Sequence, residues 1–408
     1  MANLFNIFFL VISRLKRKCK RNSRAIILSL LASLAVLRYM SVFTINGSHS
    51  KSVNQEYKTY FMQSTQRFSG TPKILNWTPF FGAMVWHHEA LDCIKTCPWK
   101  CTLTDNKNEI ASSDAVLFHL SDIIYNGYLY APFRIFRYPS YRSKDQVWVV
   151  YNLESLSNLW GNFDSFNGLF NWTVTYRRES DIYLPNAEFR HRTEAEKLEF
   201  RTNSKTINFF RNKTKTAVAM ISHCSDEARR YKLIQDLGKY IDIDIYGRCG
   251  KKCPGDFQSC DNLQYSYKFY LSFENSNCRD YVTEKFWLRQ KFHQIPIVAW
   301  DMDWKGLVPP KSFINLLDFP DIGAAARYIT QVGKNETLFN SYFDWQANFI
   351  NTFECSMCKI CKTLHSGHIP PQVYSDFGGW MKNDTCHPAS ISGYVSRVVD
   401  RFLFDARI

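Results

Sequence analysis

The sequence predicts an α/β fold in which a parallel β-sheet is covered by helices. Between residues 216 and 300, short apolar runs alternate with amphipathic segments, as consecutive strand–helix units do. The chain has 408 residues, enough for two or three domains, and it shows no internal repeat. Because ligands of such sheets bind beyond the carboxyl ends of the strands, functional residues are expected at those ends.

The first half of the chain contains three strand-like runs. "PKILNW" (72–77) and "AVLFHL" (115–120) are short and apolar, and "QVWVVYNLE" is rich in β-branched and aromatic residues. This third run extends from Gln146 to Glu154 and stops at a carboxylate. Glu154 therefore lies at the carboxyl end of a predicted strand, where a ligand-facing group is expected.

The second half alternates more regularly. "TAVAMIS" (216–222) is predicted to be a buried strand, and "DEARRYKLIQDLGKY" (226–240) a helix with acids in its first turn and a glycine near its end. "IDIDIYG" (241–247) alternates strictly and ends in glycine, which is typical of a strand. "IPIVAW" (295–300) is a further strand, so the segment predicts a parallel sheet.

The net charge of +14 is concentrated at the N-terminus. Residues 1–50 contain no acid and carry a charge of +8, so the rest of the chain carries only about +6. The basic residues of this segment are Arg14, Lys16, Arg17, Lys18, Lys20, Arg21, Arg24 and Arg38. A mild basic excess in the body suits an anionic small molecule and argues against nucleic acid as a partner.

An apolar run after the basic segment predicts a membrane anchor. "AIILSLLASLAVL" (25–37) is short for a span, but continuing to Ile45 reaches spanning length, with Arg38 able to snorkel at the far interface. The positive flank keeps the N-terminal side in the cytosol. The predicted order is a cytosolic tail (1–24), a signal-anchor transmembrane helix (25–45) and a polar stem (46–70).

Two alternatives to this topology stay open. A cleaved signal peptide would also deliver the body to the lumen, although "ASLAVL" offers no convincing cleavage site. A second apolar run at residues 4–13 could also insert into the membrane.

Glycosylation acceptors and cysteines fit a body that lies in an oxidising lumen. Asn-X-Ser/Thr sequons occur at Asn46, Asn76, Asn171, Asn212, Asn335 and Asn383. Of the thirteen cysteines, Cys19 is cytosolic in the predicted topology, which leaves an even number for the lumen. Disulfides are therefore predicted, although their pairing cannot be deduced from the sequence. Zinc is the alternative, because "CSMCKIC" (355–361) contains metal-like spacing.

The stretch "YKFYLSFENSNCRDYVTEKFW" (267–287) holds the densest set of candidate site residues. Its strand ends at Glu274, and Thr283 as an N-cap would place Glu284 and Lys285 in the first turn of a helix. A helix N-terminus at the carboxyl end of a strand is an anion site. Lys285 would add positive charge for phosphate, and Glu284 would accept hydrogen bonds from ribose hydroxyls. The pair predicts a nucleotide-sugar site; a surface Glu–Lys pair is the structural alternative.

The same stretch closely resembles the donor-site signature of the α-1,3-fucosyltransferases, in which an aromatic strand ending in Phe-Glu-Asn-Ser precedes Asp-Tyr-(Val/Ile)-Thr-Glu-Lys. Further similar segments are "LFNWTVTYRRESDIYLP" (169–185), "SHCSDEARR" (222–230), "SYFDW" (341–345) and the C-terminal cysteine cluster. The resemblance covers roughly residues 71–386. It implies a single-pass type II membrane protein of the Golgi with a lumenal catalytic domain.

The resemblance implies a GT-B arrangement of two facing Rossmann-like domains. It assigns residues 71–205 to the acceptor side, residues 206–372 to GDP-fucose binding and residues 373–408 to a C-terminal segment. The implied donor is GDP-β-L-fucose, whose β-linked sugar must be inverted to give an α-linked product. One in-line displacement needs a base for the acceptor hydroxyl proton and positive charge for the departing diphosphate.

The resemblance also implies roles for individual residues. Glu154 matches the catalytic base, Glu284 the ribose ligand and Lys285 the pyrophosphate ligand. The other implied donor contacts are Arg229, which would neutralise the diphosphate, and Ser222, Tyr270 and Asn275. The structural alternatives are Arg229 as a solvated helix residue, Tyr270 as a core residue and Glu154 as a cap of the next turn.

Departures from the family pattern concern single contacts and the acceptor. The chain has Leu156 where the family often has proline, Asn186 in place of a donor-contact tyrosine, and His223 where asparagine is common. Members that act on Lewis-type antennae usually carry His-His-(Arg/Trp)-(Asp/Glu), whereas this chain has "HLSD" (119–122). "CSMCKICKTLH" (355–365) looks more like members that fucosylate the innermost GlcNAc of N-glycans. A glycoprotein N-glycan core is therefore the expected acceptor, with Lewis-type or LacdiNAc antennae as the alternative.

Two other classes of function stay open. A metal-dependent GT-A transferase would use a DxD motif, and "DMD" (301–303) follows a predicted strand, whereas "DID" (242–244) lies within one and is expected to be structural. We predict no metal ligands and no tightly bound cofactor, with a divalent cation such as Mn²⁺ acting only as a stimulant. The other class is a non-catalytic lumenal glycan-binding protein that kept the fold.

Overall fold

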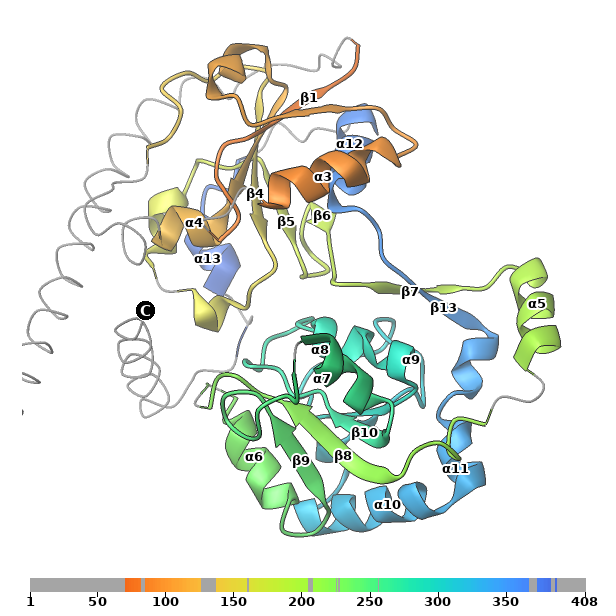
Figure 1. Ribbon diagram of the computed structural model, residues 1–408. Coiled ribbons are helices and arrows are strands. Elements are labelled where there is room, and N and C mark those ends of the chain that lie inside the picture. Colours follow the sequence, from red (N-terminus) through yellow and green to blue (C-terminus); the bar gives the residue numbers. More distant parts are fainter. Residues whose placement is uncertain are drawn as a thin grey trace, which may run out of the picture.

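The computed structural model confirms the predicted α/β class and contains two separate parallel sheets (Figure 1). The structure describes residues 70–81, 85–125, 137–159, 161–204, 208–224, 226, 228–255, 257–366, 373–382 and 386. The predicted cytosolic tail, the signal anchor and all but the last residue of the stem lie outside this range, as do the sequons at Asn46 and Asn383. No helix within the described residues is long and apolar enough to cross a membrane.

The first sheet contains six strands in the order β2-β1-β3-β4-β5-β6, all paired in parallel. Their bounds are β1 (Lys73–Asn76), β2 (Thr102–Thr104), β3 (Ala115–His119), β4 (Val147–Asn152), β5 (Trp172–Thr175) and β6 (Ile182–Tyr183). The three strands predicted in this half are β1, β3 and β4. Every residue of β3 and β4 is buried, as expected for a parallel sheet that is covered on both faces.

Alternate residues of β4 enter two cores on opposite faces of this sheet. Trp148 and Val150 pack with Phe118 on one face, whereas Val149 and Tyr151 pack on the other. The covering elements are α3 (Val85–Lys95), η1 (Lys107–Ser112), α4 (Leu120–Tyr125), η2 (Leu156–Asn158), η3 (Phe163–Phe166), α12 (Ser356–Ser366) and α13 (Phe377–Lys382). The last two belong to the C-terminal part of the chain, which therefore returns to complete both cores of the first sheet (Figure 1).

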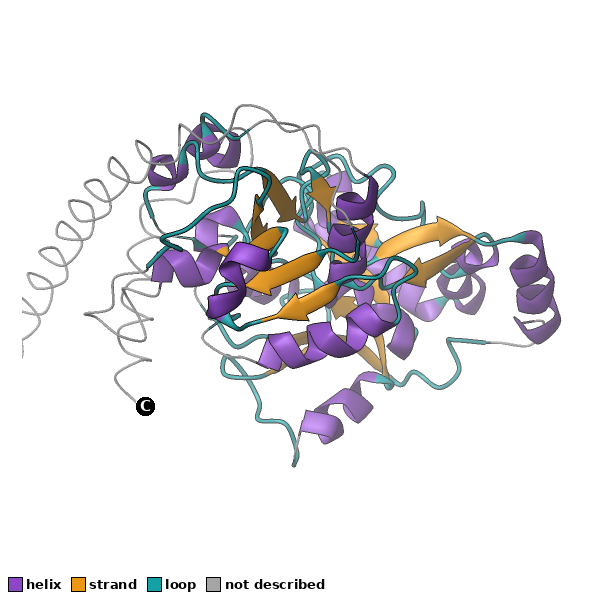
Figure 2. Ribbon diagram, turned by 90° about the horizontal axis from the view of Figure 1, so that it is seen from above, coloured by secondary structure: helices purple, strands orange, loops and turns teal. Residues whose placement is uncertain are grey.

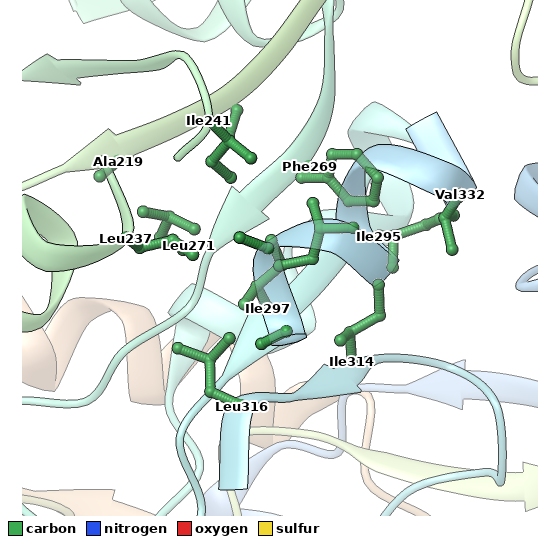
Figure 3. Close-up of a cluster of buried hydrophobic side chains, with 14 of the residues drawn as sticks. Ala219, Leu237, Ile241, Phe269, Leu271, Ile295, Ile297, Ile314, Leu316 and Val332 are labelled. Atoms are coloured by element: carbon green, nitrogen blue, oxygen red, sulfur yellow. The ribbon is translucent and has the colours of Figure 1, made fainter. Parts of the chain in front are cut away.

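The second sheet contains five parallel strands in the order β12-β11-β10-β8-β9. Its strands are β8 (Lys215–Met220), β9 (Ile243–Tyr246), β10 (Tyr267–Leu271), β11 (Ile295–Val298) and β12 (Ile314–Asn315). Its helices are α6 (Arg230–Leu237), α7 (Phe257–Gln264), α8 (Glu284–Trp287), α9 (Arg289–Phe292), α10 (Ile322–Lys334) and α11 (Glu336–Ser341), with the turns η4 (Leu316–Asp318) and η5 (Asp344–Ala347). Apolar strand residues such as Leu271 and Ile297 share its largest core with Val332 of α10, which lies near Ile295 (Figure 3).

A two-stranded antiparallel ribbon connects the two halves. β7 (Glu188–His191) leads away from the first sheet, and β13 (Phe349–Thr352) pairs with it on the way back. Helix α5 (Glu194–Ser204) lies at the far end of this ribbon, away from both sheets (Figure 1, Figure 2). The predicted domain boundaries stay predictions, but α12, which precedes residue 372, packs on the first sheet rather than on the second.

Six disulfides pair all the cysteines that the sequence places in the lumen. Three of them join the segment around α3 to α12, namely Cys93–Cys355, Cys97–Cys358 and Cys101–Cys361. The other three are Cys224–Cys249, Cys253–Cys260 and Cys278–Cys386. Disulfides are thus confirmed over the zinc alternative, because every cysteine of the "CSMCKIC" segment is bonded to another cysteine.

Removing the three disulfides between α3 and α12 together is expected to cost far more stability than removing any one. Each closes a loop of about 260 residues, and closing one such loop stabilises by about 5 kcal/mol in the chain-entropy account. Once one of these disulfides is in place, each of the other two closes a loop of only a few additional residues. The loss of a single disulfide should therefore lower the free energy of unfolding much less than the loss of all three. Denaturant unfolding of Cys97→Ser/Cys358→Ser and of the sixfold serine variant checks this. Equal losses in the two variants would contradict it, and Cys253→Ser/Cys260→Ser is the short-loop control.

Two of the predicted glycosylation sites have buried side chains, which argues against their use. Asn76 and Asn171 are 2% and 6% exposed, and Oδ1 of Asn171 accepts hydrogen bonds from the Trp148 backbone N–H (2.8 Å) and from Arg142 (2.5 Å). A glycan cannot be attached to an amide that is packed inside a folded sheet. Asn212 and Asn335 are exposed and stay proposed acceptors.

The full chain expressed in a secretory host is expected to carry N-glycans at Asn212 and Asn335 but not at Asn76 or Asn171. Mass spectrometry before and after enzymatic removal of N-glycans checks each site. Asn212→Gln and Asn335→Gln should each lose the mass of one glycan, whereas Asn76→Gln should lose none. A glycan found at Asn171 would overturn the structural argument.

Candidate active site

The second sheet has its topological switch point between β8 and β10. The chain passes from β8 outward to β9, then crosses to the other side of β8 to form β10, β11 and β12. A crevice opens at the carboxyl edge of a parallel sheet where the strand order reverses in this way. The two loops meet there, since the backbone N–H of Ala228 donates to the carbonyl of Asn275 (3.4 Å). The fold therefore brings the predicted donor residues Ser222, Arg229 and Asn275 to one edge.

Glu274 lies buried beneath this edge and organises the loop that follows β10. Its Oε1 accepts a hydrogen bond from the Thr283 backbone N–H (2.8 Å), and its Oε2 accepts one from the Thr283 hydroxyl (2.7 Å). The ammonium of Lys285 lies 3.3 Å from the same Oε2. Burial raises the pKa of Glu274, although Lys285 and both Thr283 groups oppose this. The sequence identified Glu274 only as the end of a strand and missed this organising role.

Lys285 lies between two carboxylates at this edge. Its Nζ donates to the Thr283 hydroxyl (2.8 Å) and lies 3.1 Å from Oε1 of the exposed Glu284. Burial works against the charged ammonium, but Glu274 and Glu284 outweigh it and raise the pKa of Lys285. Lys285 is therefore a permanent cation, while Glu284 offers carboxylate oxygens to solvent beside it.

The helix that follows Thr283 is shorter than predicted. α8 is a single turn, α9 follows it after Leu288, and the Thr283 hydroxyl bonds to Glu274 instead of capping the helix. One turn has little aligned dipole, which weakens the argument for a helix N-terminus as the anion site, and that expectation stays a prediction. Positive charge at this position comes from the side chain of Lys285.

Two consecutive arginines follow β8 and have different environments. Arg230 is buried and its Nε lies 2.5 Å from Oδ2 of Asp226, whereas Arg229 is exposed and its backbone is left-handed (φ 51°). The helix predicted from Asp226 begins only at Arg230 for this reason. A left-handed non-glycine residue is uncommon and indicates a functional loop. Arg230, which the sequence analysis did not single out, is close enough to oppose the charge of Lys285.

The other predicted donor residues occupy three different environments. Ser222 is exposed directly after β8. Asn275 is half-buried, and its Oδ1 is a buried oxygen without a hydrogen-bond partner among the described residues. Tyr270 is buried, and the guanidinium of Arg289 lies 3.6 Å from its ring centre. The position of Tyr270 fits its structural alternative, a core residue, better than a direct donor contact.

Glu154 extends from the carboxyl edge of the first sheet toward the second. It follows β4 and is half-buried. Its Oε1 accepts three hydrogen bonds, from the Ser155 backbone N–H (3.0 Å), the Asn158 amide (2.9 Å) and the hydroxyl of Tyr281 (2.9 Å). Within the described part of the chain, its Oε2 accepts none. Tyr281 belongs to the loop after β10, so the contact joins the two halves.

The loop from Ser276 to Tyr281 makes further contacts with the first half of the chain. The hydroxyl of Ser155 donates to that of Ser276 (2.7 Å), and Arg178 donates to Asp280 through Nε (2.9 Å) and its backbone N–H (3.0 Å). Asn186, which departs from the family pattern, donates to the Val282 carbonyl (3.2 Å). Asp280 and Arg178 lie in the motifs "DYVTEK" and "YRRES", but neither motif predicts that these two residues meet.

The first sheet has a switch point of its own, between β1 and β3. His119 is 1% exposed there, and its Nδ1 lies 2.5 Å from Oδ2 of Asp122, which also accepts from the backbone N–H of Phe81 (2.8 Å). The histidine of "HLSD" is therefore buried and paired with Asp122, and it lies beneath the surface at this edge of the sheet. Phe81, by contrast, is 46% exposed.

Two parallel sheets meet at their carboxyl edges, with Lys285 on one and, among the described residues, an unbonded oxygen of Glu154 on the other. Such a frame is compatible with a glycosyltransferase that uses a nucleotide sugar. Comparison with known proteins gives the family. Residues 210–380 match the family described as glycosyltransferase family 10 (fucosyltransferase) C-term, and residues 69–187 match the family described as fucosyltransferase, N-terminal. The chain belongs to the family 10 fucosyltransferases.

Relatives in animals agree with this assignment. The chain is 30% identical to Alpha-(1,3)-fucosyltransferase C of Drosophila melanogaster, over 88% of this chain and 89% of that protein. It is 34% identical to Glycoprotein 3-alpha-L-fucosyltransferase A of the same organism, over 69% and 54%. A crystal structure of an alpha1,3-fucosyltransferase with GDP-fucose is 17% identical, with a TM-score of 0.49 over 78% of this chain and 97% of that one.

Proposed function

We propose that this protein transfers L-fucose from GDP-β-L-fucose in α-1,3 linkage to a GlcNAc residue of a glycoprotein glycan. Membership of the family supports the reaction. The observation that carries the proposal is the position of Glu154, whose Oε1 is held from both halves of the chain while its Oε2 accepts no hydrogen bond from the described residues. We also propose that the two sheets form the GT-B arrangement implied by the family.

The reaction is a single displacement at the anomeric carbon of fucose. The 3-hydroxyl oxygen of GlcNAc forms the new bond, and the bond from that carbon to the β-phosphate oxygen breaks, so that GDP leaves with the electron pair. Glu154 Oε2 takes the hydroxyl proton. Because the attack occurs opposite the leaving group, the β-linked donor gives an α-linked product without a covalent intermediate.

Residues at the carboxyl edge of the second sheet are assigned to the binding of GDP-fucose. Lys285 and Arg229 would neutralise the charge that develops on the diphosphate, and Glu284 would accept hydrogen bonds from the ribose hydroxyls. Asn275 has a buried oxygen at this edge that accepts no hydrogen bond from the part of the chain that the structure describes, and a donor group of the substrate could satisfy it. Ser222 is exposed at the same edge and is the last of the residues that we assign to donor binding.

No tightly bound cofactor is required by this chemistry, and we propose that a divalent cation such as Mn²⁺ only stimulates. Asp244 of "DID" is engaged by Lys251 (2.6 Å) and Lys215 (3.2 Å), and Oδ1 of Asp303 in "DMD" accepts from the Lys305 backbone N–H (3.1 Å). Transfer is therefore expected to persist in EDTA and to rise no more than several-fold with added Mn²⁺. Complete loss of initial rate in EDTA, restored by Mn²⁺, would contradict this.

We propose the N-glycan core as the acceptor and the Golgi membrane as the location. The C-terminal cysteine segment and the departure at "HLSD" support the core over Lewis-type or LacdiNAc antennae. The relative named Glycoprotein 3-alpha-L-fucosyltransferase A fits a glycoprotein acceptor. Residues 25–45 would anchor the chain with its body in the lumen, and the six disulfides fit that oxidising compartment.

GDP release by the full chain with GDP-fucose tests this function. The acceptors are an N-glycan with a chitobiose core, N-acetyllactosamine and LacdiNAc, and Glu154→Ala is measured beside the wild type. Transfer to the core GlcNAc that is about 10²- to 10⁴-fold slower in the variant is the expected result. Transfer to lactosamine or LacdiNAc alone would refute the core acceptor and retain the enzyme. Binding of glycan without turnover would support the non-catalytic alternative.

A further inference from the structure

The proposed base is held by residues from both halves of the chain. Ser155 and Asn158 are its neighbours in sequence, so their hydrogen bonds to Oε1 form wherever this turn is folded. Tyr281 is 127 residues away and supplies the third hydrogen bond, at 2.9 Å. With three donors on Oε1, rotation of the carboxylate is restricted, and Oε2 keeps a fixed direction.

Tyr281 is built to donate this hydrogen bond. Its side chain is 4% exposed and packs against Leu153 and the edge of Tyr176, with ring centres 4.9 Å apart. Burial, and then the negative charge of Glu154, raises the pKa of Tyr281 well above its ordinary value. The hydroxyl therefore stays protonated, and its proton lies between the two oxygens.

The backbone beside Tyr281 is held in an unusual conformation. Asp280 is left-handed (φ 62°) and buried, a conformation that a non-glycine residue keeps only where its surroundings enforce it. The two hydrogen bonds from Arg178 and the contact between Ser155 and Ser276 provide this enforcement from the first half. The loop is thus fixed to the half that carries Glu154.

The same loop continues into the residues assigned to the donor. Glu284 and Lys285 follow Tyr281 by three and four positions, and both Thr283 and Lys285 are tied to buried Glu274. We propose that Tyr281 is the positioning residue of this enzyme: its hydroxyl aims Oε2 of Glu154 at the acceptor hydroxyl and couples the base to the donor-binding loop. This inference rests on the proposed function, because it needs Glu154 to be the base.

The test compares Tyr281→Phe with Tyr176→Phe in the full chain. Both variants remove one buried tyrosine hydroxyl from the same aromatic cluster, but only the Tyr281 hydroxyl bonds to Glu154. Tyr281→Phe is expected to lower kcat about 10- to 100-fold, since misplacement of a catalytic group costs this much. The Kd for GDP should change less than about twofold, because the aromatic ring and the loop contacts remain. Tyr176→Phe should keep kcat within about threefold of the wild type by the same argument.

A double-mutant cycle separates positioning from a general structural effect. If Tyr281 acts through Glu154, adding Tyr281→Phe to Glu154→Ala lowers the residual rate no further. The same fold-loss in both backgrounds, or a wild-type kcat in Tyr281→Phe, would overturn the inference. Should Tyr281→Phe fail to fold, Asn158→Ala removes another donor from Oε1 and is expected to lower kcat with GDP binding intact. Full activity of Glu154→Ala would instead refute the assignment of the base, a distinct outcome.

Discussion

Glu154→Gln is expected to lower kcat for fucose transfer by about 10²- to 10⁴-fold, the usual contribution of a general base. Glutamine has the shape of glutamate and can accept the hydrogen bonds that Oε1 receives from Tyr281, Asn158 and Ser155. It cannot take a proton from the acceptor hydroxyl. Binding of GDP should be unchanged, because the residues assigned to the diphosphate lie on the other sheet.

The measurement is kcat for transfer beside the Kd of GDP from calorimetry. Glu109→Gln is the matched control: it replaces a partly exposed glutamate of the first half that pairs with Lys73, the first residue of β1, and so lies at the opposite, amino edge of the sheet. That variant should keep its activity. Loss of GDP affinity in Glu154→Gln equal to the loss of kcat would show that the residue supports donor binding and not proton transfer.

Lys285→Met is expected to weaken GDP binding about 10- to 100-fold, the usual range for a hydrogen bond to a charged group. The ammonium is the cation nearest to the buried carboxylate of Glu274, and it is the side chain that we assign to the diphosphate. Lys285→Arg should retain part of the affinity, because the charge is kept but the guanidinium is larger and planar. Calorimetry with GDP measures both.

The same substitution should make the stability of the protein depend more steeply on pH. Burial raises the folded-state pKa of Glu274, and the positive charge of Lys285 lowers it. Without Lys285, this pKa therefore rises further above its unfolded value. The folded state then binds more protons than the unfolded state, so stability falls as the pH rises above the unfolded pKa. The melting temperature of Lys285→Met should therefore drop, relative to the wild type, more at pH 8 than at pH 5.

Two controls separate these effects. Lys291→Met removes a half-exposed lysine of α9 that pairs with Asp261, and it should change neither GDP affinity nor the pH dependence. Glu274→Gln combined with Lys285→Met should remove the extra pH dependence while GDP binding stays weak. A melting temperature of Lys285→Met that follows the wild type at every pH would show that Glu274 does not depend on this cation.

Much of the second half could be predicted from the sequence, because β10 and β11 are apolar runs with mostly buried side chains and β9 alternates regularly. β9 and β11 fall within predicted strands, and β8 and β10 each begin one residue before the strand predicted there. The predicted starts of the helices are less accurate, since helix capping depends on tertiary contacts. The helix expected from Asp226 starts at Arg230, because the backbone of Arg229 is left-handed. The Thr283 hydroxyl donates to Glu274 and does not cap its own helix.

The parts of the site that could not be predicted depend on contacts between distant residues. The motif around Glu284 and Lys285 predicted one edge of the candidate site, and the strand before Glu154 predicted the other. Nothing in either motif shows that Tyr281 reaches Glu154, because that contact depends on how the two halves pack. The pairing of cysteines some 260 residues apart could not be predicted for the same reason. Nor could the burial of Asn171, which belongs to a sequon among apolar residues.

The most direct test of the central claim is a proton NMR time course of the full chain with GDP-β-L-fucose and an N-glycan carrying a chitobiose core. The account predicts that the β-anomeric signal of the donor declines as an α-fucosyl signal appears on the 3-position of GlcNAc, with one GDP released per fucose. A β-linked product, or donor consumed to free fucose with the acceptor unchanged, would contradict inverting transfer with Glu154 as the base.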